Sequence, residues 1–153
     1  MLFSYMIRSL RDTFPTRNSE WGLATMLLLW GVILDFDPTL FARSPSFDGM
    51  ARLFDQSTWA VLCFLTGVGR LAMLTVNGFW RRSPHLRAMG AFLGSGFWFQ
   101  ITLSFLQSET TSTGLAIYPV LFLLDAYNVL RALGDAGHTD KYYRAMDVRS
   151  FDK

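Results

Sequence analysis

Two ionisable side chains lie deep inside otherwise apolar segments of this 153-residue chain. Arg70 interrupts the apolar run over residues 57–80, and Asp125 interrupts the run over residues 113–133. An ionisable residue in a membrane-spanning helix is costly, so it faces a partner or water and marks a candidate site. An arginine and a carboxylate can form a bidentate bond that satisfies several donors at once. These two residue types therefore suggest an intramembrane ion pair.

The expected depths of the two charges also match. Arg70 comes 13 residues after position 57, and Asp125 comes 12 residues after position 113, in runs that we expect to cross in the same direction. At about 1.5 Å per residue the charges lie roughly 20 and 18 Å from the same end. Equal depth and opposite sign predict that Arg70 pairs with Asp125. Two roles stay open for the pair: fixing which helices are neighbours, and acting as a gate or relay along a wet path.

Further polar and small residues are expected near this pair. Polar residues at helical spacing predict faces that bond neighbouring helices or line a path, namely Thr66, Asn77, Gln100, Ser104 and Asn128. Gly90 and Gly94 form a small-xxx-small pattern that permits close approach of two helices.

The elements that must position these residues are helices in a membrane. Hydrophobic residues make up 51% of the chain and charged residues only 17%, against about one quarter charged in soluble domains. A spanning helix needs about 20 mostly apolar residues. Four runs approach that length, and they cover residues 21–36, 57–80, 88–107 and 113–133. We therefore expect one all-α, polytopic membrane domain over residues 1–153, with a cytoplasmic tail at 134–153.

The orientation follows from the basic residues, because short cytoplasmic loops are enriched in Lys and Arg. These residues gather in the N-terminal segment, the second connection and the tail: Arg8, Arg11, Arg17, Arg81, Arg82, Arg87, Arg131, Lys141, Arg144, Arg149 and Lys153. The first connection is acidic instead. The pattern predicts four crossings with both termini inside.

Several segments near the ends of the spans are expected to be interfacial. Apolar residues at helical spacing in residues 1–18 are typical of an amphipathic helix lying flat on the inner leaflet, although a frayed terminus would show the same composition. Ser46 is expected to cap a short loop helix whose apolar face meets the lipid surface. Trp21, Trp59 and Trp80 are interpreted as belt anchors, and Pro119 is expected to kink the last span.

The residue types exclude several classes of function. Cys63 is a single cysteine in an apolar run, so a disulfide framework is not available. His85 and His138 lie in hydrophilic stretches, which leaves no haem ligands in the spans and no metal cluster. We see no phosphate loop, no activated nucleophile and no paired carboxylates. A net charge of +2 is too mild for a nucleic-acid binder. We therefore expect no catalytic residues, no metal, no cofactor and no nucleic-acid partner.

Five stretches resemble small four-helix membrane proteins of tailed phages and prophages. They are residues 70–78, 80–87, 97–102, 112–119 and 123–128, within a similarity that covers residues 20–133. The resemblance implies a bacterial inner-membrane location and a phage context. Holins, which oligomerise and permeabilise the inner membrane, are the commonest functional class among such proteins.

The leading functional hypothesis is thus a holin-like, homo-oligomeric membrane protein. One alternative is a non-enzymatic interaction protein, such as a superinfection-exclusion or assembly factor that docks a phage or host membrane protein. The next is a small ion-coupled transporter. All three hypotheses have the lipid bilayer as a partner.

Overall fold

The structure is a computed structural model that describes the backbone of residues 2–75 and 83–151, and the side-chain surroundings of residues 17–75 and 84–143. The described chain is all-helical. Its elements follow in the order α1 (Leu2–Phe36), α2 (Leu40–Arg43), η1 (Pro45–Phe47), α3 (Asp48–Ala51), α4 (Gln56–Thr75), α5 (Ser83–Leu106), η2 (Thr113–Ala116) and α6 (Tyr118–Phe151).

Four of these helices are long and apolar enough to cross a membrane. The apolar spans cover Arg17–Phe36, Gln56–Thr75, Pro84–Leu106 and Thr113–Tyr143. Each corresponds to one of the four runs predicted from the sequence, with shifted boundaries. The first span has 20 residues instead of the short run expected at 21–36. The end of the second predicted run, including Asn77 and Trp80, lies outside the described residues.

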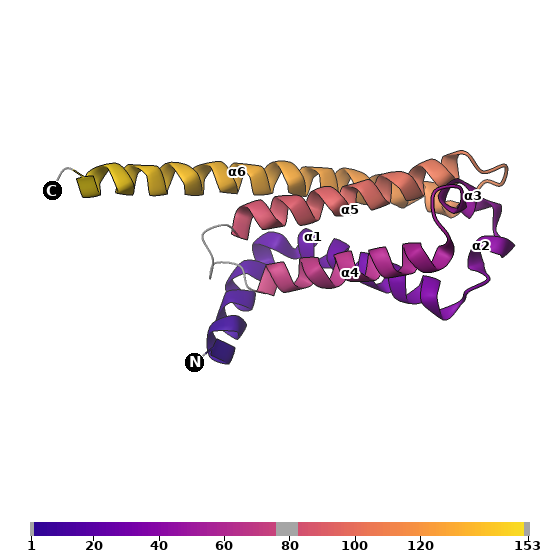
Figure 1. The fold of residues 1–153 in the computed structure, drawn as a ribbon, viewed down its shortest axis with the longest axis horizontal. Helices are drawn as coiled ribbons and strands as arrows, with labels where there is room; N and C mark the ends of the chain where they lie inside the picture. Colours follow the sequence, from indigo (N-terminus) through magenta and orange to yellow (C-terminus); the bar gives the residue numbers. More distant parts are fainter. Residues whose placement is uncertain (1, 76–82, 152–153) are drawn as a thin grey trace.

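The four long helices form two pairs. α1 packs along α4, and α5 packs along α6, while contacts between the pairs are fewer (Figure 1). Glycines bring the backbones of the first pair together: a Cβ on Gly31 would lie 2.6 Å from the Phe64 nitrogen, and one on Gly67 would lie 2.6 Å from the Leu28 nitrogen. The close helix approach expected at Gly90 and Gly94 is therefore found at these two other glycines.

Both chain termini lie at one end of the bundle, which we call the terminal end (Figure 1). The opposite end carries α2, η1, α3 and η2, and we call it the loop end. α1 bends near the terminal end, where Arg17 has non-helical angles of φ −132° and ψ 22°. This kink separates the residues predicted to lie at the interface from the apolar span. Whether residues 1–18 lie flat on a membrane stays a prediction.

The core at the loop end is aromatic. Trp98 is fully buried, and its ring stacks on that of Tyr118. Tyr118 also meets Trp30 and Phe105 edge to face, and Phe105 meets Phe47 in the same way. Aromatic pairs of this geometry add about 0.5–1.5 kcal/mol each to the free energy of area burial. These aromatic side chains form a plug at the loop end of the bundle.

The loop between α1 and α4 packs into this core, which corrects three expectations. Ser46 lies inside η1, and the N-cap of α3 is Phe47, without a side-chain cap hydrogen bond. Phe47 and Met50 are buried in the bundle core and do not face lipid. Trp59 is 5% exposed, and its Nε1 donates to the Met50 carbonyl at 3.0 Å, so it fixes the loop instead of anchoring a membrane belt.

The last helix is longer than predicted. Pro119 is the second residue of α6 and causes no kink, because proline is tolerated in the first turn, where its missing N–H has no intrahelical partner. α6 passes through Gly134 and continues to Phe151. The tail predicted at 134–153 is thus continuous with the last span as one helix up to Phe151, and where the membrane ends along this helix stays a prediction.

Candidate functional site

Arg70 and Asp125 meet in the interior of the bundle. The guanidinium donates from Nη1 to Asp125 Oδ2 and from Nη2 to Asp125 Oδ1, both at 2.6 Å. Arg70 is 5% exposed and Asp125 is fully buried. The structure therefore brings together the two residues paired by depth and sign, in the bidentate geometry that arginine and carboxylate favour. The bond joins α4 of one helix pair to α6 of the other.

Two glycines of α5 leave the space that the Arg70 side chain needs. A Cβ on Gly90 would come within 3.1 Å of Arg70 Cγ, and a Cβ on Gly94 would overlap both Arg70 Nη1 and Asp125 Oδ2. Real Cβ atoms do not tolerate such overlap, so the neighbours would have to move. Gly90 and Gly94 thus accommodate an ion pair instead of a second helix backbone.

A second buried ion cluster, which sequence reasoning did not predict, lies nearer the terminal end. Arg87 donates from Nε to Glu20 Oε2 at 3.0 Å and from Nη2 to Glu20 Oε1 at 2.5 Å. Its Nη1 donates to Asp135 Oδ2 at 3.0 Å. Glu20 and Arg87 are each 3% exposed, so Arg87 is not the solvated loop charge that the sequence analysis assigned. This cluster joins α1 to α5 and α6.

A signal for this second cluster was present in the sequence. Glu20 directly precedes the first apolar run and Arg87 directly precedes the third. Both runs are expected to start at the same membrane face, so the two residues have equal depth and opposite sign. The comparison that paired Arg70 with Asp125 would have found them, had it included charges at the ends of the runs.

A small cavity separates the two ion clusters. Its volume is about 10 Å³, and its lining comprises Glu20, Arg70, Met73, Leu74, Arg87 and Gly90. A polar cavity needs roughly 10–15 Å³ to hold one water molecule. The cavity is therefore at the lower limit for a single water and offers no room for a larger ligand in this conformation.

A further polar contact between the pairs involves Asn128, which is fully buried. Its Oδ1 accepts a hydrogen bond from Ser19 Oγ at 3.0 Å, while its Nδ2 has no hydrogen-bond partner among the described residues. We call the set Ser19, Glu20, Arg70, Arg87, Asp125 and Asn128 the charged seam. Each of its three contacts links a helix of the α1/α4 pair to a helix of the α5/α6 pair.

The other predicted polar residues do not form a shared path with the seam. Ser104 is 1% exposed; it donates to the Ser46 carbonyl at 2.7 Å and accepts from the Met50 nitrogen at 3.1 Å. Gln100 reaches the Gly49 carbonyl at 3.5 Å. Both residues therefore hold the loop against α5. Thr66 is half-buried one turn before Arg70 on α4, and Asn77 lies outside the described residues.

The chemistry of the seam is that of paired charges. Arg70 and Arg87 face Glu20, Asp125 and the partly exposed Asp135, and every one of these groups has an opposite charge within hydrogen-bond distance. Within the described ranges, no three His, Cys, Asp or Glu side chains gather in a way that could hold a metal ion. The seam can thus hold two helix pairs together or expose charge when they separate.

Comparisons with protein-family models, curated proteins and solved structures find no match to this chain. The resemblance to small phage membrane proteins therefore stays a prediction.

Proposed function

We propose that this chain is a non-enzymatic, holin-like protein of the bacterial inner membrane that forms homo-oligomers and permeabilises the bilayer. The observation that carries the proposal is the charged seam, which lies between two helix pairs and not within either pair. In the described conformation the charges neutralise one another, and the bundle is closed. Separation of the pairs would expose both signs of charge to water along the interior.

The position of the seam along the bundle supports this proposal. Ionisable residues inside spans are expensive and mark water or ion pathways by default. The charged groups of the seam occupy the half of the bundle nearer the terminal end, while aromatic side chains fill the loop end. A path opened along the seam would have to displace that plug. In this proposal, the described packing is the closed state, and its paired charges lie inside the membrane-spanning bundle.

The proposed orientation places both termini in the cytoplasm. Basic residues favour that side for the N-terminal segment and the tail, and four crossings return the chain to the side from which it started. The kink at Arg17 would let the residues before it lie on the inner leaflet while the span from Arg17 onward crosses. Reporter fusions after positions 45 and 83 test this orientation: we expect the first outside and the second inside.

A cross-linking experiment tests the proposed opening. Ser19→Cys with Asn128→Cys places two thiols across the seam, in a background carrying Cys63→Ala. Induced expression should collapse the proton gradient and release a vesicle-trapped dye, and a short bis-methanethiosulfonate reagent should stop the leak until reductant is added. Val32→Cys with Val61→Cys, on the two helices of one pair, serves as the matched control and should leak with or without the reagent. Tight membranes at high expression would refute permeabilisation.

A docking role is the second candidate, and the loop favours it. The loop is folded against α5 by the Ser104 and Gln100 bonds, yet it exposes large apolar side chains. Leu53 is 53% exposed and Phe54 is 50% exposed. A rigid platform with apolar side chains suits a partner protein at the membrane surface. Replacing both residues by serine would abolish such docking but leave permeabilisation intact.

A further inference from the structure

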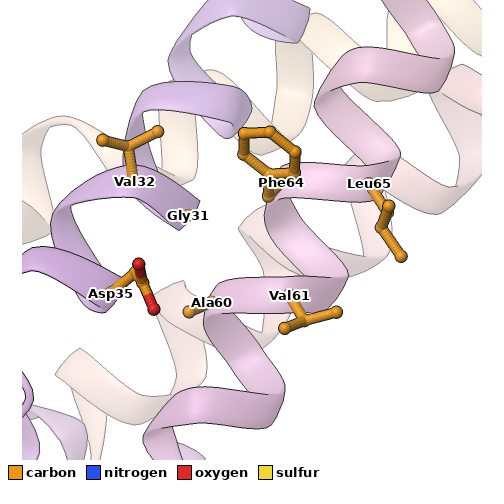
Figure 2. A pocket seen from close by; sticks show the side chains of 7 residues that line it. All are labelled: Gly31, Val32, Asp35, Ala60, Val61, Phe64 and Leu65. Carbon is orange, nitrogen blue, oxygen red and sulfur yellow. The ribbon is translucent and has the colours of Figure 1, made fainter.

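A groove runs along the outer surface of the α1/α4 pair (Figure 2). Its volume is about 270 Å³. The buried Gly31 and Ala60 form its floor, and its walls are apolar side chains that are more than a third exposed: Val32, Val61, Phe64 and Leu65. All of these residues lie within the two apolar spans Arg17–Phe36 and Gln56–Thr75. The groove therefore opens toward the hydrocarbon of a bilayer.

One charged group, Asp35, lines this apolar groove. Figure 2 shows its carboxylate directed toward the gap between the two helices, beside Ala60. Asp35 is exposed, and none of the described residues forms a hydrogen bond or an ion pair with its side chain. It also lies in the last turn of α1, where the negative end of the helix dipole disfavours an acid and favours a cation. The carboxylate thus lacks a positive partner.

A second hollow continues the groove beyond Asp35. It has a volume of about 290 Å³, and Asp35, Asp55 and Ser57 are among its lining residues. The pKa of Asp55 is lowered to about 2, because Ser57 and Thr58 donate hydrogen bonds to the ionised form. Two carboxylates therefore line this second hollow, which we call the mouth of the groove. It lies where α1 ends and α4 begins, at the edge of their apolar spans.

Gln56 keeps the mouth in place. Its Nε2 donates to the carbonyls of Leu34 at 2.7 Å and Asp37 at 2.6 Å, and its Oε1 accepts from the Phe41 nitrogen at 2.8 Å. The first residue of α4 thus satisfies the Leu34 carbonyl in the last turn of α1, and it adds a second donor to the Asp37 carbonyl, which also accepts from the Leu40 nitrogen. This bonding holds Asp35 against the start of α4.

We propose that the groove binds a membrane lipid whose headgroup ends in a primary ammonium, with an acyl chain along the apolar walls and the ammonium at Asp35. An apolar channel that ends in two carboxylates with no ion pair among the described residues complements a chain that ends in a cation. A primary ammonium carries three N–H donors for carboxylate oxygens, which a quaternary ammonium lacks. A net anionic headgroup would be repelled by Asp35 and Asp55. The proposal does not depend on permeabilisation.

Lipid retention by the purified full chain tests the site. Native mass spectrometry would be performed after equilibration with phosphatidylethanolamine, phosphatidylcholine or phosphatidylglycerol carrying identical acyl chains. We expect one phosphatidylethanolamine to be retained about tenfold more strongly than the other two, the factor that one charge-assisted hydrogen bond supplies. Asp35→Asn should remove this preference. Asp48→Asn, which changes an exposed acid of the loop away from the groove, should keep it.

A second pair of variants tests the groove itself. Val61→Trp fills the wall and should abolish retention of any lipid at this site, whereas Leu62→Trp, one residue further along α4 and outside the lining, should not. Helical content and the midpoint of thermal unfolding verify that each variant is folded. Equal retention of the three lipids, unchanged selectivity in Asp35→Asn, or a cross-link between two copies through position 61 would overturn the proposal.

Discussion

Gly94 leaves open the space that the guanidinium of Arg70 occupies: a Cβ at position 94 would overlap Arg70 Nη1. A single methyl group on α5 is therefore expected to break an ion pair between α4 and α6. Gly94→Ala should lower the free energy of unfolding by about 1–3 kcal/mol, the usual cost of forcing atoms into a packed interior. Unfolding in mixed micelles, followed by circular dichroism, measures this change.

Gly96→Ala is the matched control for that substitution. Gly96 is two residues away on the same helix, and a Cβ there would meet nothing within 4 Å. Because glycine costs a helix about 0.5–1 kcal/mol relative to alanine, Gly96→Ala should be neutral or stabilising. If the two variants had the same free energy of unfolding, a methyl group would fit beside Arg70 without cost, which would contradict the prediction.

The Arg70–Asp125 bond should contribute strongly to the cohesion between the helix pairs. Removing one member of a buried pair leaves an uncompensated charge and costs about 3–5 kcal/mol. Arg70→Gln and Asp125→Asn should each destabilise the protein by that order, and the double variant Arg70→Asp with Asp125→Arg should recover part of the loss. The same micelle unfolding assay applies.

The exposed pair between Arg43 and Asp37 is the control for the buried one. Arg43 is 62% exposed in that pair, and surface pairs contribute about 0–1 kcal/mol. Arg43→Gln should therefore leave the unfolding curve almost unchanged. Single variants of Arg70 or Asp125 that match the stability of the parent protein would contradict the importance of the buried bond.

The spans and the central ion pair could be predicted because they depend on distance along the chain alone. Apolar length sets the four long helices, and depth along a helix of fixed rise places Arg70 level with Asp125. The environment of Gly94 could not be predicted in the same way. A glycine in an apolar helix is compatible with a neighbouring backbone or a neighbouring side chain, and only the packed structure distinguishes them.

The loop between α1 and α4 shows why the rest was less predictable. Trp59 is the residue type of a membrane anchor and Ser104 that of a hydroxyl facing another helix, yet both bond to the backbone of the short loop helices at Met50 and Ser46. Helices of three or four residues are too short for a sequence period from which their partners follow. Glu20 and Arg87 were missed for a different reason, since charges at the ends of spans resemble solvated loop charges.

The start of α4 should loosen in strong acid. Hydrogen bonds from Ser57 and Thr58 lower the pKa of Asp55 from its ordinary value of 3.8 to about 2. Because the folded value lies below the unfolded one, the stabilisation from this carboxylate is complete above pH 3.8 and is lost as the pH falls through 2. A carboxyl carbon titration by NMR should give that midpoint. Ser57→Ala should raise it, and an unchanged midpoint in that variant would contradict the role of the Ser57 hydroxyl.

The two acids that share Arg87 should differ strongly in importance. Glu20 is 3% exposed and accepts two bonds from the guanidinium, whereas the Asp135 side chain is 43% exposed and accepts one. Glu20→Gln should cost about 3–5 kcal/mol because it leaves Arg87 buried without its main counter-charge, and Asp135→Asn should cost at most about 1 kcal/mol because water replaces the lost bond. Both changes keep side-chain size, so micelle unfolding of the two variants compares charge alone. Equal losses would mean that water reaches Arg87 as easily as it reaches Asp135. The Glu20–Arg87 contact between α1 and α5 would then not be the main bond at the terminal end of the seam.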